Sequence, residues 1–203
     1  MTGLDLEKDG LIEVAVVVTD SDLEPVDEGF EIVIKPSPQA LANMGKFVTN
    51  MHRSSGLLPL LQDGVSMSEA SEKVLAYITE RVPEPNKALL GGNSVGMDKA
   101  FLTRDMPAVI DHLHYRIIDV STIKELAKRW YPRSYFAAPA KTGNHRALGD
   151  IFDSIDELRY YRATIMVDGG PSIDESKEIA ASISESRSQD KATAPSAEDP
   201  AGQ

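Results

Sequence analysis

The sequence contains no cysteine, and this absence excludes two structural features. A chain without thiols has no disulfide framework and no thiolate zinc centre. Its first ten residues, MTGLDLEKDG, lack the basic and apolar regions of a secretory signal. We therefore expect a protein of the reducing cytoplasm.

Long apolar runs and positive charge are also scarce. The apolar run from Val14 to Val18 is far shorter than the roughly 20 residues that cross a bilayer, so no membrane partner is expected. The formal net charge of −11 argues against a protein that coats long nucleic acid, because such proteins neutralise many phosphates. A short nucleic-acid ligand is still allowed, since bound divalent metals and a few local donors can hold it.

The 203 residues, 41% of them hydrophobic, are enough to bury one core with some chain left over. Composition changes at Gly169-Gly170-Pro171, which predicts a folded domain over residues 1–168 and an acidic tail over 169–203. From Ser172 onward the chain is rich in Ser, Ala, Asp and Glu and has no aromatic residue. We expect this tail to be disordered, with a transient helix over residues 172–187.

Strand and helix patterns alternate along the domain. Period-two or continuous apolar segments predict strands over residues 11–19, 30–35, 88–93 and 116–120. Helical spacing predicts helices over residues 66–81, from 98 onward, 122–130 and 146–162. Thr122, followed three residues later by Glu125, matches a capping box. Such alternation is typical of an α/β sheet.

Three sequence blocks carry more specific information. They are MTGLDLEKDGLIEVAVVVTD at the start, GNSVGMDKAFLTRDMP with HYRIIDVSTIKELAKRWYP in the middle, and HRALGDIFDSIDELRYYR near the end. In order and separation these blocks resemble oligoribonucleases, from Met1 to about Tyr161. The resemblance implies a ribonuclease H-like mixed sheet flanked by helices. It also implies a 3′–5′ exoribonuclease that hydrolyses very short RNA, dinucleotides included, to 5′-mononucleotides.

The resemblance implies a site for two Mg²⁺ or Mn²⁺ ions, which prefer carboxylate ligands. It makes Asp98 and Asp150 metal ligands, and it makes His145 the general base that deprotonates the attacking water. Taken singly, each residue has an ordinary alternative: a helix-start carboxylate, an acid on a solvated helix face or a surface imidazole. Their joint occurrence in family order favours the catalytic interpretation.

The same resemblance assigns substrate contacts. Positions matching the family's terminal-phosphate and substrate contacts are Ser94, Tyr115, Arg116, Ser121 and Thr122, and Tyr115 is also placed near catalysis. Leu4 matches a residue that wedges between the terminal bases, and His52 matches a base or phosphate contact. The alternatives are a core leucine, a packed tyrosine and serine or threonine helix caps. Trp130 shares a helix face with Leu126, four residues earlier, and is interpreted as a core residue or a subunit contact rather than a platform for stacking bases. The resemblance also implies a homodimer, in which the second subunit completes the site near residues 129–131.

Two departures from the family bear on activity. Oligoribonucleases carry an Asp-x-Glu pair on a strand immediately before MTGL, and here Met1 is the M of that motif. The sequence therefore predicts a sheet that lacks the family's first strand and a metal site that lacks two of its four carboxylates. Asp5 and Glu7 have the right spacing but follow the motif, so they are not taken as substitutes. Gly149 stands where an acidic residue is common. The alternative function is a noncatalytic protein that binds short oligonucleotides.

Overall fold

The computed structural model describes residues 1–140 and 146–193, with the side chains of 1–140 and 146–185. The chain divides into two compact units, Met1–Ile165 and Met166–Gln203. In the second unit the described part forms one helix, α9 (Ile173–Thr193), where the sequence predicted only a transient helix. The domain boundary predicted after residue 168 stays a prediction.

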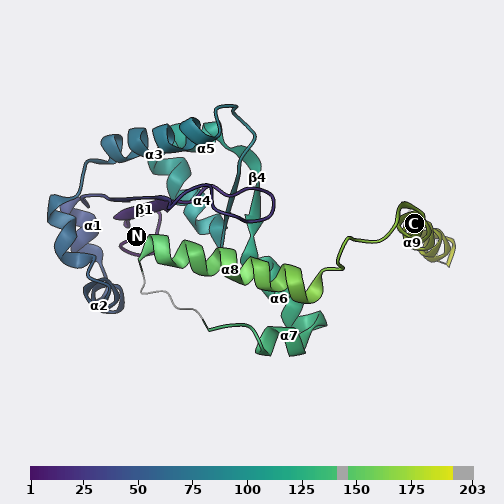
Figure 1. Ribbon diagram of the computed structural model, residues 1–203. Coiled ribbons are helices and arrows are strands. Elements are labelled where there is room, and N and C mark those ends of the chain that lie inside the picture. Colours follow the sequence, from purple (N-terminus) through teal and green to yellow (C-terminus); the bar gives the residue numbers. More distant parts are fainter. Residues whose placement is uncertain (141–145, 194–203) are drawn as a thin grey trace, which may run out of the picture. The chain divides into compact units, whose positions relative to one another are not determined.

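The first unit contains two pairs of strands (Figure 1). β1 (Glu13–Val16) pairs antiparallel with β2 (Phe30–Val33), and β3 (Leu89–Gly92) pairs parallel with β4 (His114–Asp119). The four predicted strands are therefore present; the first three are shorter than predicted, and β4 begins two residues earlier. The predicted mixed α/β fold is therefore confirmed, with one antiparallel and one parallel strand pair; within the described residues no further strand joins the two pairs.

Eight helices and one 3-10 turn complete the described part of the first unit. They are α1 (Pro38–Asn43), α2 (Lys46–Ser54), η1 (Leu58–Asp63), α3 (Met67–Arg81), α4 (Val95–Asp105), α5 (Pro107–His112), α6 (Val120–Trp130), α7 (Pro132–Phe136) and α8 (Ala147–Ile165). α3 begins where predicted, because the Ser66 hydroxyl accepts a hydrogen bond from the backbone N–H of Glu69. α4 begins earlier than predicted, at Val95.

The predicted capping box of α6 is wrong. The helix begins two residues before Thr122, and its N-cap is Asp119, whose side chain accepts a hydrogen bond from the backbone N–H of Ser121. Asp is as good a cap as Thr, and here the strand ends directly at the cap. Thr122 therefore lies in the first turn of the helix and is exposed.

The main core lies between the first strand pair and helices α3 to α5. It includes Val14 and Ile32 from the strands, Val74 and Ile78 from α3, Phe101 from α4, Val109 from α5, and Met106 between these two helices. A second cluster, of Ile12, Leu57 and Leu61, packs η1 against the residue that precedes β1. The start of β1 is thus anchored in both clusters, while the buried Glu13 lies between Ile12 and Val14 in the chain.

Two phenylalanines in helices provide a test of this core. Phe101 is completely buried, whereas the Phe47 side chain is 81% exposed. Phe101→Ala is expected to lower the free energy of unfolding by about 3–5 kcal/mol, because it removes a buried ring and leaves a cavity. Phe47→Ala should change it by less than about 0.5 kcal/mol. Urea denaturation followed by circular dichroism measures both, and equal losses would contradict this core.

Candidate functional site at the ends of the parallel strands

The parallel pair β3 and β4 ends at a single edge of the sheet. Because the strands are parallel, with Gly92 opposite Asp119, the segments that follow them meet there. In open α/β sheets ligands bind outside the carboxyl ends of the strands. The first segment contains Asn93 and Ser94, and Ser94 adopts a left-handed backbone conformation (φ 54°) just before α4.

Asp119 joins the two segments. Its Oδ1 accepts hydrogen bonds from the backbone N–H of Ser94 at 3.0 Å and from that of Ser121 at 2.9 Å. The hydroxyl oxygens of the two serines are consequently only 3.1 Å apart. Two predicted substrate-contact residues that lie 27 positions apart in the chain are therefore brought together by one carboxylate.

Tyr115 and Arg116 present polar and aromatic groups on β4, and both are exposed. The Arg116 Nε donates a hydrogen bond to the Tyr115 hydroxyl at 3.1 Å, and the Tyr115 ring stacks on His114 with centroids 4.5 Å apart. Lys99 of α4 donates to the Tyr115 carbonyl oxygen at 2.8 Å. The alternative of a packed tyrosine at the sheet edge is wrong, because the Tyr115 side chain is 70% exposed.

Asp98 lies in the first turn of α4 and is half-buried. Burial raises the pKa of its carboxyl above the usual value. The positive charge of the Met1 amino group lowers the pKa of Asp98, and the negative charge of Asp119 raises it. Asp98 therefore lies within electrostatic reach of the Asp119 carboxylate that organises the strand ends.

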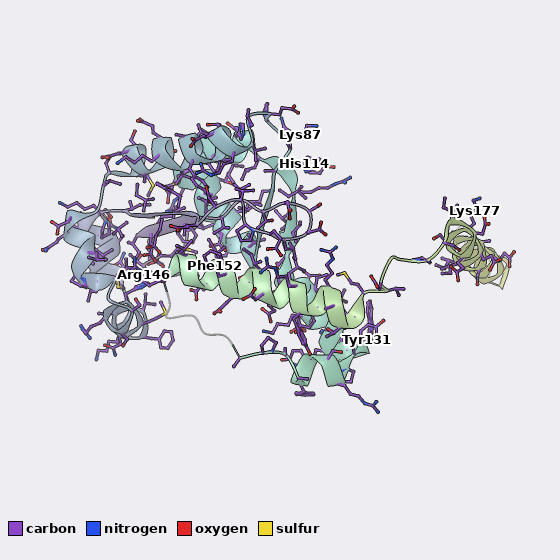
Figure 2. All side chains as sticks on the ribbon, in the orientation of Figure 1. Lys87, His114, Tyr131, Arg146, Phe152 and Lys177 are labelled. Carbon is purple, nitrogen blue, oxygen red and sulfur yellow. The ribbon has the colours of Figure 1, made fainter. Side chains whose placement is uncertain are left out.

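A pair of glutamates from β1 and β2 holds the start of α8. Arg146 donates from Nε to Glu13 at 2.7 Å and from a terminal nitrogen to Glu31 at 2.8 Å. The same carboxylates accept the backbone N–H of Ala147 at 2.9 Å and that of Leu148 at 3.4 Å. Carboxylates satisfy the unpaired N–H groups of a first helical turn and interact favourably with its positive end. Figure 2 shows Arg146 at the start of α8.

Asp150 follows one turn into α8, and its side chain is exposed. The placement of this helix start by Glu13 and Glu31 therefore also fixes the backbone of Asp150. His145, the predicted general base, lies outside the described residues, directly before Arg146.

The carboxylate oxygens of Asp98 and Asp150 are the type of ligand that a hard divalent cation prefers. Within residues 1–140 and 146–193, no group of three or more His, Asp or Glu side chains is arranged to hold a metal ion.

The N-terminal segment and α2 place the remaining predicted residues. Leu4 is 67% exposed, so the alternative of a core leucine is wrong. His52 is buried, and its Nε2 donates a hydrogen bond to the carbonyl oxygen of Met1 at 3.0 Å, which ties α2 to the segment that carries Leu4. Asp5 lies in a turn, where its carboxylate pairs with Lys8 at 2.7 Å and accepts the N–H of Glu7, in agreement with its rejection as a metal ligand.

Sequence reasoning missed several residues that build the site. They are Glu13, Glu31, Asn93, Asp119, Lys124, Ser154 and Glu157. A usable signal existed for Glu13, an acid inside an apolar run, and for Asp119, an acid between a strand and a helix. The other residues gave no such signal, because their hydrogen-bond or ion-pair partners lie in distant parts of the chain.

Two further expectations concern the burial of Trp130 and the presence of a membrane-spanning helix. The Trp130 side chain is 66% exposed, so its interpretation as a core residue is wrong. None of the described helices combines the length and the apolar character needed to cross a membrane.

The contacts of Arg146 with Glu13 and Glu31 at the start of α8 can be tested by substitution of Arg146. Arg146→Met should lower the free energy of unfolding by about 3 kcal/mol, because it leaves the Glu13 carboxylate, whose side chain is 5% exposed, without its guanidinium. Arg162→Met is the matched control, since the Arg162 pair with Asp22 has side chains 51% and 67% exposed. Its expected cost is below about 1 kcal/mol. Chemical denaturation measures both free energies of unfolding, and equal losses would contradict this role of Arg146.

Comparison with known proteins agrees with the geometry. The exonuclease family profile matches residues 1–158. An oligoribonuclease of Streptomyces griseus is 57% identical over 185 residues, covering 91% of this chain and 92% of the relative. Oligoribonucleases of Streptomyces coelicolor (56% over 182 residues, 89% and 91%) and Mycobacterium avium (49% over 201 residues, 96% and 94%) are also similar. The chain therefore belongs to the exonuclease family, in its oligoribonuclease branch, and is a nuclease.

Proposed function

We propose that this nuclease hydrolyses very short RNA, dinucleotides included, from the 3′ end and releases 5′-mononucleotides. The observation that carries the proposal is the meeting of Ser94 and Ser121 at the ends of β3 and β4, with Asp98 one turn further along the same segment. Hydroxyl donors and a carboxylate thus lie at the same edge of the sheet. An RNA bound there would have its terminal phosphate and its scissile phosphate only a few nucleotides apart. The names of the relatives support the same substrate class.

The terminal phosphate would be bound by the hydroxyls of Ser94 and Ser121 and by the exposed guanidinium of Arg116. A guanidinium fork matches phosphate oxygens, and hydroxyls at a helix start add donors near its positive end. Thr122, in the first turn of α6, is the further donor assigned to this group. A phosphate held at this edge closes the groove behind the second nucleotide, which selects short substrates.

The exposed side chain of Leu4 would wedge between the bases, and that of Tyr115 would contact the reacting phosphate. His52 acts on the same segment, because its hydrogen bond to Met1 fixes the backbone that carries Leu4. An exposed apolar side chain held on a tethered segment is suited to wedge between two bases without sequence selectivity.

Asp98 and Asp150 would hold divalent metal, Mg²⁺ or Mn²⁺, in a site for two ions. Bound metal of this kind stabilises the attacking and leaving oxygens of a phosphodiester. His145 would take the proton of the attacking water. Asp150 is suited to its place because Glu13 and Glu31 fix the helix start that precedes it.

The carboxylates provide the direct test. Cleavage of a 5′-labelled RNA dinucleotide with Mg²⁺ or Mn²⁺ should fall at least about 100-fold in Asp98→Asn and in Asp150→Asn, because an amide is a weaker ligand and carries no charge. Asp156→Asn is the control on the same helix, since Asp156 is 65% exposed and pairs only locally with Arg159. It should retain wild-type activity.

Two outcomes would overturn the proposal. Undiminished cleavage by folded Asp98→Asn and Asp150→Asn would remove these residues from the site. A wild-type protein that binds the dinucleotide in the presence of metal without cutting it would be a binding protein for short oligonucleotides instead. Circular dichroism of each variant separates loss of activity from loss of fold.

We further propose that the protein is a homodimer that uses the junction of α6 and α7. The Trp130, Tyr131 and Phe136 side chains there are 66%, 47% and 80% exposed, respectively. Clustered aromatic side chains on a surface are typical of protein contacts. Figure 2 shows Tyr131 at this junction. The second copy would bring its residues 129–131 toward the site.

Trp130→Glu should dissociate the dimer, because a charge replaces an apolar ring at the proposed contact. Light scattering coupled to size-exclusion chromatography at micromolar concentration gives the mass of the particle. Phe47→Glu is the matched control, an exposed aromatic side chain on α2 that should leave the dimer intact. A monomeric wild type, or a Trp130→Glu variant that is still dimeric, would contradict this contact.

A further inference from the structure

The N-terminal loop, residues 2–10, is closed by hydrogen bonds between its two ends. The backbone N–H of Thr2 donates to the carbonyl oxygen of Gly10 at 2.9 Å, and the N–H of Gly10 donates to the Thr2 hydroxyl oxygen at 3.1 Å. Thr2 is buried, whereas Leu4, two residues further along, is 67% exposed. The loop therefore presents an apolar side chain to solvent from a backbone whose ends are tied together.

The Asp9 carboxylate holds this loop on both sides of Leu4. Its Oδ1 accepts a hydrogen bond from the Thr2 hydroxyl at 2.9 Å, and its Oδ2 accepts one from the backbone N–H of Asp5 at 2.9 Å. The backbone N–H of Asp9 in turn donates to the carbonyl oxygen of Asp5 at 2.8 Å. The Thr2 hydroxyl thus donates one bond and accepts one, and each carboxylate oxygen accepts one, so donors and acceptors match.

Gly3 allows the carboxylate to approach the backbone directly before Leu4. A Cβ atom at residue 3 would lie 2.2 Å from Asp9 Oδ2 and 2.6 Å from the Asp9 carboxyl carbon. Any side chain there would displace the carboxylate, so this close approach requires glycine. Asp9 consequently contacts three of the residues that surround Leu4 in the chain.

Hydrogen bonds rather than apolar packing decide where this loop lies. Residues 7–10 line a cavity of about 710 Å³, together with residues 35–40 and the start of α3. The turn of the loop is attached to α4 by Arg104, which donates to the carbonyl oxygen of Leu6 and pairs with Asp105 at 2.6 Å. Because α4 also carries Asp98, the loop and the strand-end site share one helix.

We propose that Asp9 is a positioning residue for Leu4: its carboxylate fixes the backbone on both sides of Leu4, so that the side chain is in place before two bases bind. A side chain held in its bound position loses little conformational freedom on binding, and the affinity for the bases is higher as a result. This inference rests on the proposed function, because it takes the contact between Leu4 and the bases as given. It requires no contact between Asp9 and the RNA.

The test compares two RNA dinucleotides with a 5′-phosphate, one intact and one without its 3′-terminal base, as ligands of the full chain in EDTA. Both have the same phosphates and sugars, so the ratio of their dissociation constants, here called the base preference, reports contacts with the bases. Calorimetric titration gives both constants without cleavage. The wild type should prefer the intact ligand at least about tenfold, and Leu4→Ala should lower this preference at least about threefold, because less apolar surface is buried between the bases.

Asp9→Asn keeps the size of the side chain and removes one acceptor. An amide has a single oxygen, so in either orientation the Thr2 hydroxyl proton or the Asp5 N–H loses its acceptor. The base preference should fall to that of Leu4→Ala within about twofold. The double variant of Leu4→Ala and Asp9→Asn should show no further loss, because Asp9 acts through Leu4.

Asp20→Asn is the matched control for the change of charge. The Asp20 Oδ1 accepts the backbone N–H groups of Asp22 and Glu24, both at 2.9 Å, in the loop between β1 and β2. The substitution therefore makes the same chemical change at a carboxylate that holds a different loop. It should leave the base preference at the wild-type value.

Thr2 supplies a second pair of variants, which carries the test if circular dichroism shows that Asp9→Asn does not fold. Thr2→Val removes the hydroxyl at nearly the same size and should lower the base preference at least about threefold, because one carboxylate oxygen loses its donor. Thr2→Ser keeps the hydroxyl and should keep the base preference within about twofold of the wild type.

Two results would overturn the positioning role of Asp9. They are an unchanged base preference in Asp9→Asn, and losses from Leu4→Ala and Asp9→Asn that add in the double variant. A Leu4→Ala variant with the wild-type base preference would instead overturn the contact between Leu4 and the bases on which this role depends. Failure of the proposed hydrolysis is seen separately, in the cleavage assay, since the base preference is measured by binding alone.

Discussion

The attachment of α8 to the two strand pairs is the constraint on which the site depends. At its start, Arg146 and the first backbone N–H groups are held by Glu13 and Glu31 of β1 and β2. Further along, Ser154 and Glu157 are held by Asn93 at the end of β3. The two strand pairs share no strand among the described residues, so α8 connects them through polar contacts.

This arrangement explains why buried polar residues recur in a small protein. Glu13 and Glu157 are each buried, yet each has a cation within 2.8 Å and at least one N–H donor. Such pairs contribute little net stability, but loss of one partner is costly. They specify a single position for α8, whereas apolar packing alone tolerates shifts along the helix. The metal-ligand role proposed for Asp150 on that helix needs this kind of placement.

The same logic separates the residues proposed to contact substrate from those that place them. Ser94, Arg116 and Tyr115 are exposed and face solvent at the ends or surface of the parallel pair. Asp119 and Asn93 lie behind the serines and take up their N–H and O–H groups. The exposed residues at the strand ends are thus backed by a layer of polar side chains that fixes their geometry.

The sequence by itself determined the strands, the long helices and the family, because apolar periodicity and ordered motifs are local features. The roles of Asp98 and Asp150 stay predictions from the same motifs. The sequence misplaced the cap of α6 at Thr122, since several polar residues in succession compete for one cap position. Only the tertiary structure decided that Glu13 and Glu31 meet Arg146, that Leu4 and Trp130 are exposed, and that Asn93 joins Ser121 to Ser154. These contacts join residues 28 to 133 positions apart, and no local pattern specifies which distant partner satisfies a buried polar group.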